Sequence, residues 1–585
     1  RIFEAYDKTK DHHFFYRQHV IKPDLIGMLG AWISGGVEWC VFHHHRNTTF
    51  MPVDYTVEEH KDGSKTIWIG ETERRHRMKW TLGLTLHPGV SRLDVTARLF
   101  NDTPYAHSFL YWANVAIHAT EGYQVIFPPS TQFATFHGKN EFPRWPISHE
   151  EFNGMDYTEG VDVSWWKNHP KPTSFFAWNV QEDFFAGYDH GLRAGVVHVA
   201  DHHIAPGMKL WTWGTESTWD RTRLTDEDGP YAEIMVGAWS DNQPDYSWLQ
   251  PHETKDFMQS WYPLRDLGGV CNATLEAAVN LEIGENRARV AFNTAGTHEK
   301  ARAVLTAGGQ TLLDETIAIA PDNPFSSEAA LLPGAEDTEV RAALYAEDGT
   351  LLVDYQPRVY APRPMPEPVT PPPAPGEIET VEELYLAGQR LEQFHNPTME
   401  PYPYYEEALK RDPDNVRVNT VLAIDDCKRG RYGQAEKRLR RAVARLTHNH
   451  TRPRNGEPHY YLGVALAGQQ RYDEACDAYN RAAWNAAWYG PAQFALAQLA
   501  SREGDFGRAL EHIDNALSAN TRDVRAMTLR AAVLRQLGRA EAALKQARVA
   551  LDFDPLDFTA ANERALAQTA LGKRRMAKKT LEELA

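Results

Sequence analysis

The fold of this chain is decided by residues 198–249, which read HVADHHIAPGMKLWTWG over 198–214 and, after a polar loop, PYAEIMVGAWSDNQPDYSWL over 230–249. Two segments of it, His198–Ile204 and Tyr231–Trp239, resemble β-strands bounded by turn formers. The stretch combines carboxylates, histidines and indoles. Indole rings stack on the apolar faces of sugars, while carboxylates and imidazoles hydrogen-bond hydroxyl groups or transfer protons. This mixture on strands predicts a carbohydrate site on a β-sandwich.

The bulk composition limits the classes of protein to which the chain can belong. A chain of 585 residues is too long to fold around a single hydrophobic core, so three or four domains are expected. With 79 acidic and 62 basic residues the net charge is −17, which argues against a nucleic-acid partner. No apolar run is long enough to span a membrane. Four scattered cysteines predict reduced thiols and a cytoplasmic location, with the periplasm as the alternative. The chain opens at Arg1 as if inside a strand, so we expect a preceding segment.

The character of the sequence changes three times along the chain. Residues 1–268 contain short alternating strands and long aromatic insertions, which predict one large β-sandwich with a binding surface on its loops. Residues 269–360 lose most of the aromatics and are typical of a small immunoglobulin-like sandwich. Residues 361–377 contain eight prolines and predict an extended, semi-rigid linker. Residues 378–585 are helical and repetitive.

The C-terminal part repeats every 34 residues. Tyr472, Phe506 and Ala540 follow this spacing, as do the small residues that would let paired helices approach closely: Ala475, Ala509, Ala543, Ala482, Ala516 and Ala550. This period is that of the tetratricopeptide repeat and predicts an α-helical solenoid. Such arrays bind protein segments or mediate self-association, so a protein partner or a homo-oligomer is expected. A purely structural cap on the sandwich is the alternative.

Four stretches in the first 265 residues carry a family resemblance. They read DLIGMLGAWISGGVEWCVFHHH (24–45), FLYWANVAIHATEGYQVIFPP (109–129), HVADHHIAPGMKLWTWG (198–214) and YAEIMVGAWSDNQPDYSWLQPHE (231–253). Together they resemble a bacterial family known only as a domain of unknown function, often joined to tetratricopeptide repeats. Its sandwich is grouped with the galactose-mutarotase-like proteins. The resemblance implies a two-sheet supersandwich with a concave, sugar-binding face.

The resemblance also implies catalytic positions. In mutarotases a mid-domain His protonates the ring oxygen and a late-strand Glu takes the anomeric proton, positions that His118 and Glu233 resemble here. Strand alternation places Asn114 and His118 on one face. Glu38, after a glycine pair, is the second carboxylate. The contexts NHSYFNL and ETQ of the mutarotases are absent, so simple mutarotation is disfavoured.

The leading hypothesis is a glycoside hydrolase acting on an oligosaccharide. Hydrolysis needs one protonated and one ionised carboxyl group, about 5–5.5 Å apart for retention or about 6.5–9.5 Å apart for inversion. The predicted catalytic residues are Glu233, Glu38 and His118. The predicted substrate-binding residues are Asn114, His44, His45, Arg46, His202, His203, Trp211, Trp213, Asp201, Asp241 and Gln243. For Asp241 a turn held by its own side chains is the competing interpretation.

No metal and no cofactor are predicted. Adjacent histidines alternate faces, so at most His43 and His45 share one, and the run lacks the HExxH spacing. Motifs for nucleotides, nicotinamide or a serine nucleophile are absent from the sequence. Two alternatives to hydrolysis stay open. One is a sugar epimerase or polysaccharide lyase on the same fold, and the other is a non-catalytic glycan-binding scaffold whose repeats recruit partners.

Overall fold

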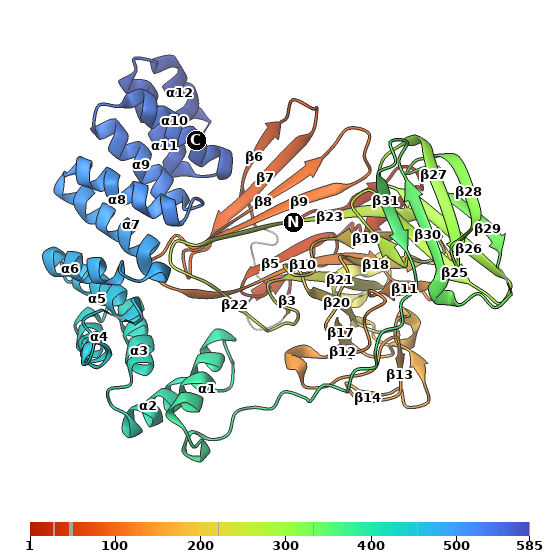
Figure 1. Cartoon of the computed structure of the whole chain (residues 1–585), viewed down its shortest axis with the longest axis horizontal. Helices are drawn as coiled ribbons and strands as arrows, with labels where there is room; N and C mark the ends of the chain where they lie inside the picture. The colour runs from red at the N-terminus through yellow and green to blue at the C-terminus, as the bar shows by residue number, and fades with distance from the viewer. Residues whose placement is uncertain (27–29, 46–50, 220, 332, 453, 584–585) are drawn as a thin grey trace.

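The computed structural model describes residues 1–26, 30–45, 51–219, 221–331, 333–452 and 454–583. The chain forms a large β-sandwich, a small β-sandwich and a helical solenoid, in that order (Figure 1). This confirms the predicted fold class.

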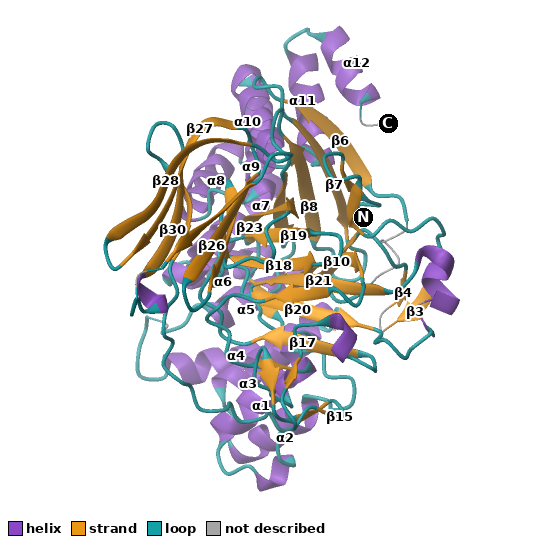
Figure 2. Cartoon of the chain, turned by 90° about the vertical axis from the view of Figure 1, so that its right-hand side faces the viewer, coloured by secondary structure: helices purple, strands orange, loops and turns teal. Residues whose placement is uncertain are grey.

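The large sandwich consists of two antiparallel sheets. We call the first the site sheet, and its order is β12 (Ala134–Thr135), β17 (Thr173–Ala177), β20 (Gly207–Thr212), β21 (Tyr231–Ala238), β10 (His107–His118) and β22 (Ser247–Leu249), with β5 (Val37–Phe42) also paired to β10. The second, the outer sheet, has the order β11 (Tyr123–Ile126), β18 (Phe184–Asp189), β19 (Ala194–Val199), β23 (Thr254–Arg265), β9 (Leu93–Phe100), β8 (Lys79–Leu86), β7 (Lys65–Thr72) and β6 (Asp54–Glu59). Figure 2 shows β10, β21, β20 and β17 side by side.

Strand alternation divides the site sheet into an apolar face and a polar face. Val115, Ile234 and Leu210 point into the core between the two sheets, where they meet outer-sheet residues such as Val95 and Trp261. Because side chains alternate along a strand, every second residue of β5, β10, β20 and β21 points away from that core. The opposite face therefore carries the polar residues that could form a site.

One predicted strand is partly wrong. β19 ends at Val199, and the following residues turn, with the amides of Ile204 and Ala205 bonding to the carbonyl of Asp201. The strand also belongs to the outer sheet, whereas Tyr231–Ala238 belongs to the site sheet. The two predicted strand segments thus lie in different sheets.

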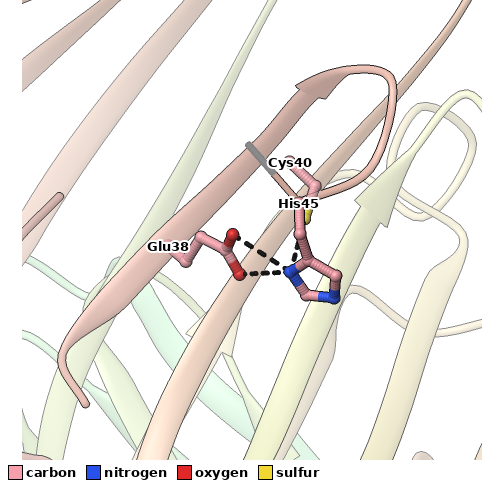
Figure 3. A group of neighbouring side chains, drawn as sticks. All are labelled: Glu38, Cys40 and His45. Carbon is pink, nitrogen blue, oxygen red and sulfur yellow. Dashed lines mark hydrogen bonds and ion pairs between the residues drawn. The ribbon is translucent and has the colours of Figure 1, made fainter. Parts of the chain in front are cut away.

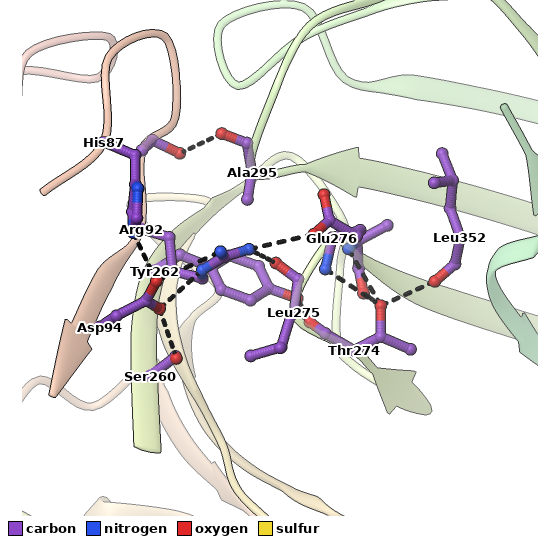
Figure 4. Close-up of polar contacts among 12 residues, drawn as sticks. His87, Arg92, Asp94, Ser260, Tyr262, Thr274, Leu275, Glu276, Ala295 and Leu352 are labelled. Atoms are coloured by element: carbon purple, nitrogen blue, oxygen red, sulfur yellow. Dashed lines mark hydrogen bonds and ion pairs between the residues drawn. The ribbon is translucent and has the colours of Figure 1, made fainter. Parts of the chain in front are cut away.

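The small sandwich follows directly and is joined to the large one by polar contacts. Its two sheets are β24 (Asn272–Ala273), β25 (Ala277–Ile283), β26 (Arg287–Thr294) and β29 (Phe325–Ala330), and β28 (Gln310–Ile319), β27 (His298–Ala307), β30 (Val340–Tyr345) and β31 (Leu351–Tyr355). At the junction Arg92 pairs with Asp94 and donates to the carbonyl of Leu275 at 2.6 Å (Figure 4). The Tyr262 hydroxyl donates to the carbonyl of Thr274 at 2.8 Å. These bonds fix the small sandwich against the outer sheet.

The helical part packs against the large sandwich along one side (Figure 1). Its helices are α1 (Val381–Gln393), α2 (Tyr402–Arg411), α3 (Val416–Lys428), α4 (Tyr432–Thr447), α5 (Glu457–Gly468), α6 (Tyr472–Ala482), α7 (Ala486–Glu503), α8 (Phe506–Ala519), α9 (Val524–Gln536), α10 (Ala540–Phe553), α11 (Phe558–Ala570) and α12 (Arg574–Glu582). The 34-spaced Ala475, Ala509 and Ala543 are buried where helices pair. Tyr461 of α5 accepts a hydrogen bond from the amide of Ala106 at 3.2 Å. Part of the solenoid surface therefore contacts the protein's own sandwich.

The linker also contacts the sandwich. The amide of Val369 donates to the carbonyl of Lys139 at 2.8 Å, and the amide of Arg363 donates to Gln132 at 2.9 Å. Residues 361–374 form no helix or strand and run as an extended segment (Figure 1), whereas Pro375–Glu377, which the prediction also covered, form a short 3-10 helix before α1.

We expect Gly237→Ala to destabilise the sandwich. A methyl group at this position of β21 would overlap with the buried indole of Trp112 on the neighbouring strand. Overpacking of this kind costs about 1–3 kcal/mol. Fifteen of the 17 tryptophans precede residue 262, so tryptophan fluorescence during thermal unfolding reports on this domain. Gly433→Ala in α4 is the control: its methyl group meets no atom within 4 Å, so stability should stay equal or rise slightly. An unchanged midpoint for Gly237→Ala would contradict the packing.

Candidate functional site

The polar face of the site sheet brings residues from four strands together. Asn114 of β10 lies opposite Glu38 of β5, and Ala116 of β10 lies opposite Glu233 of β21. Trp211 of β20 in turn lies opposite Glu233. The two carboxylates thus sit on the strands either side of β10, on one face. We call Glu38, Cys40, His45, Asn114, Lys209, Tyr231 and Glu233 the polar cluster.

Glu38 is an anion held by hydrogen bonds. Its side chain is only 1% exposed and contacts His45 Nδ1 at 2.9 and 3.1 Å (Figure 3). The Asn114 amide nitrogen donates to it at 3.0 Å. Burial by itself raises the pKa of Glu38, but the charge and hydrogen bond of His45 outweigh this effect, with help from Arg1 and Asn114. The pKa of Glu38 is therefore lowered.

Glu233 has the opposite electrostatic environment. It is 3% exposed, and burial together with the nearby negative charge of Glu38 raises its pKa to about 7. The Tyr231 hydroxyl donates a hydrogen bond to it and acts against that rise. A carboxyl group that is protonated near neutral pH can act as a general acid.

Lys209 is a member of the cluster that the sequence predictions missed. It is buried, and burial lowers its pKa to about 8 despite the attraction of Glu233. Its ammonium group donates to Gln243 at 3.0 Å and contacts His137 Nε2 at 3.2 Å. Strand alternation, which places Lys209 on the same face of β20 as Trp211, was the signal in the sequence that could have identified Lys209. The hydrogen bond from Lys209 places Gln243 beside the polar cluster.

Half-buried indoles border the cluster. Trp211 lies 4.5 Å from Trp213, whose ring is 4.0 Å from Trp219. Trp211 approaches Tyr231 at 5.9 Å between ring centroids, and Tyr231 also contacts Trp32, which is itself buried, at 5.9 Å. Rings of this kind provide the flat apolar surfaces on which sugars stack.

Two other predicted residues are not members of the polar cluster. His118 shares the polar face but stacks on Tyr16 at 3.9 Å, and burial, aided by His12 and His13, lowers its pKa to about 4. Burial lowers the pKa of His44 to about 4, and the nearby positive charges of His45 and Lys209 contribute to this shift.

Three predicted substrate-binding residues lie in the turn after β19, away from the cluster. Asp201 pairs with His203, and His202 pairs with Asp183. Asp241 pairs at 2.7 Å with Lys139, which lies outside the turn of Asp241. Arg46 lies outside the described residues.

Two groups in the described part of the chain have ligand atoms close enough for one metal ion. Glu38, Cys40 and His45 form the first, which is buried except for its half-buried histidine. Asp201, His202 and His203 form the second, which is largely exposed. Residues that could hold an organic cofactor are not evident among those described.

Three family models match the chain. Residues 1–264 match the model described as Domain of unknown function (DUF5107), residues 272–355 match YphG-like protein, second domain, and residues 420–491 and 494–558 match Tetratricopeptide repeat. The chain therefore combines a DUF5107 domain, a YphG-like domain and tetratricopeptide repeats. The family resemblance drawn from the four sequence stretches is confirmed by the first match.

Solved structures similar to the chain have low sequence identity. A TPR-domain containing protein from Parabacteroides distasonis ATCC 8503 covers 100% of this chain and 80% of its own, at 17% identity and a TM-score of 0.39. A putative aldose 1-epimerase from Klebsiella pneumoniae subsp. pneumoniae MGH 78578 covers 40% of this chain and 64% of its own, at 13% identity and a TM-score of 0.30. YrrB, a TPR protein with an unusual peptide-binding site, covers 30% of this chain and 89% of its own, at 16% identity and a TM-score of 0.27.

Among the described residues, no helix combines the length and the apolar character needed to cross a membrane.

Proposed function

We propose that the large sandwich is a carbohydrate-active enzyme that hydrolyses a glycosidic bond of an oligosaccharide. The observation that carries this proposal is the placement of Glu38 and Glu233 on one sheet face, on the strands either side of β10. Two carboxyl groups acting from separate positions are what this hydrolysis requires. The neighbouring indoles of Trp211 and Trp213 supply stacking surfaces for sugar rings.

The two carboxyl groups have different roles. Glu233, whose pKa is about 7, protonates the leaving-group oxygen as the general acid. Glu38, which accepts hydrogen bonds from Asn114 and His45, is the charged partner on the other side of β10. Lys209 and Gln243 are donors that can orient sugar hydroxyl groups. Hydrolysis is favoured over epimerisation because His118, which an epimerase would pair with Glu233, packs against Tyr16 instead.

The helical repeats have a second proposed role. Repeats of this kind recruit protein segments or a second copy of the chain. Because part of the solenoid surface contacts the protein's own large sandwich, a recruited partner would bind to the rest of the solenoid surface.

A screen of oligosaccharides with product detection tests the proposed function. A hydrolase releases new reducing ends without ultraviolet absorption, a lyase releases them together with an unsaturated product that absorbs ultraviolet light, and an epimerase produces neither new ends nor absorption. Binding without any turnover across the screen would instead favour the glycan-binding scaffold. The expected result is release of reducing ends that depends on Glu233 and is not accompanied by an ultraviolet-absorbing product.

The pH profile of the reaction should follow Glu233. Because the acid must be protonated, we expect turnover to fall as the pH rises through about 7, the pKa of Glu233. The hydrogen bond from Tyr231 stabilises the ionised form, so Tyr231→Phe should raise the pKa further. The falling limb of the profile should then move to higher pH. If the falling limb does not move in Tyr231→Phe, the limb reports the ionisation of a group other than Glu233.

A further inference from the structure

Three potential metal ligands converge at the end of β5. Glu38 and Cys40 are two residues apart on this strand and therefore point to the same face. The turn that follows, with His44 in the left-handed region at φ 46°, returns the chain so that the His45 ring faces both side chains (Figure 3). His45 Nδ1 lies 2.9 Å from Glu38 Oε2 and 3.7 Å from Cys40 Sγ.

We propose that Glu38, Cys40 and His45 bind a divalent transition-metal ion of the zinc class. Thiolate, imidazole and carboxylate are the ligands that zinc uses in proteins, and a thiolate disfavours calcium and magnesium. Metal–ligand distances of about 2.0–2.3 Å in a tetrahedron place the ligand atoms about 3.3–3.6 Å from one another. The three ligand atoms already lie within 4.8 Å of one another, so small movements of side chains complete the geometry.

A fourth group points to the same place. Asn114 is 1% exposed, and its amide nitrogen lies 3.0 Å from Glu38 Oε2 and 3.3 Å from Cys40 Sγ. Its amide oxygen has no hydrogen-bond partner within the described part of the chain, which is costly for a buried polar atom. A half-turn of the amide, which exchanges its oxygen and nitrogen, would direct the oxygen toward Glu38 and Cys40, where it could serve as a fourth ligand.

The competing interpretation is a plain ion pair between Glu38 and His45. Such a pair needs no thiol, yet Cys40 Sγ contacts both His45 and Asn114. Removing the thiol therefore separates the two interpretations, because Cys40→Ala leaves the pair and its hydrogen bonds in place.

Metal retention by the full chain tests the site. The protein is incubated with Zn²⁺ or Co²⁺, desalted and analysed for metal by mass spectrometry and, for Co²⁺, by absorption spectroscopy. We expect about one ion per chain in the wild type and a reduction of about tenfold or more in Cys40→Ala. Cobalt bound to the thiolate should give charge-transfer absorption in the near ultraviolet that Cys40→Ala lacks.

Two controls make the result specific. Cys476→Ala removes a half-buried thiol of α6 and should leave retention unchanged. Asp201→Asn with His203→Gln removes the exposed group, where adventitious ions would bind, and should also leave it unchanged. If Cys40→Ala does not fold, Cys40→Ser and the cobalt spectrum of the wild type take its place. Wild type that retains no more metal than Cys40→Ala, or that shows no thiolate absorption with cobalt, overturns the proposal.

This inference does not rest on the proposed function. Metal content is measured without turnover, so either proposal can fail while the other stands. They meet at Glu38, since a bound ion would occupy the carboxylate that the hydrolase otherwise uses as its charged partner. Glu233 is not among the three proposed ligands.

Discussion

Glu233→Gln is expected to lower turnover by about 10²–10⁴-fold, the range typical for the loss of a general acid. Glutamine keeps the shape of the side chain and can still accept the hydrogen bond from Tyr231. It also removes a buried group that must ionise as the pH rises, so the fold should be as stable as before. Turnover of the oligosaccharide found in the screen and the thermal midpoint are measured on the same preparation.

Asp201→Asn is the matched control for this prediction. Asp201 is also among the substrate-binding residues predicted from the sequence, but its side chain is 57% exposed and pairs with His203 in the turn after β19. Its amide variant should therefore retain full turnover. Normal turnover in Glu233→Gln, or equal losses in both variants, would remove Glu233 from the catalytic role.

The second large effect is expected at the contact between solenoid and sandwich. Asp523 caps the first turn of α9, accepting a hydrogen bond from the amide of Ala526 at 2.9 Å. It is 5% exposed. Burial and the negative charge of Asp102 together raise the pKa of Asp523 to about 7. Burial also raises the pKa of Asp102, which follows β9, to about 6. Two acidic groups thus resist ionisation at one interface.

Asp523→Asn should stabilise the protein at neutral pH. The folded pKa of about 7 lies above the ordinary value, so the contribution of Asp523 to stability is complete below about pH 4 and is lost as the pH rises to about 7. Asparagine caps helices as well as aspartate does and does not ionise. The gain should therefore grow between these pH values and level off above them, reaching at most about 4 kcal/mol.

Helix circular dichroism during thermal unfolding, repeated between pH 4 and 8, measures this effect. Asp505→Asn is the control, since Asp505 caps α8 through the amide of Arg508 at 3.0 Å but is exposed. It should change the midpoint little at any pH. A destabilised Asp523→Asn, or one whose midpoint parallels the wild type at every pH, would contradict a protonated Asp523.

The sequence by itself determined the local features of this protein. The 34-residue period predicted the solenoid because each repeat must place its small residues where paired helices meet. Alternation put Tyr231 and Glu233 on one face of a strand, and Asn114 on a definite face of another, because the side-chain period of a strand is two. The four quoted stretches also predicted the family that the residues 1–264 match.

Tertiary structure alone decided which of these faces meet. Alternation says on which side a residue lies but not which strand is its neighbour, so the pairing of Glu38 with Asn114, 76 positions away, was not predictable. The same applies to Cys40, predicted only as a reduced thiol, and to the neighbours of Lys209, because alternation gives the face of Lys209 on β20 but not what lies beside it. Asp201 shows the converse: it is near the site strands in sequence but lies in a turn that follows a strand of the outer sheet. Register between distant strands is set by the packing of two whole sheets around one core, and that packing is a property of the complete chain.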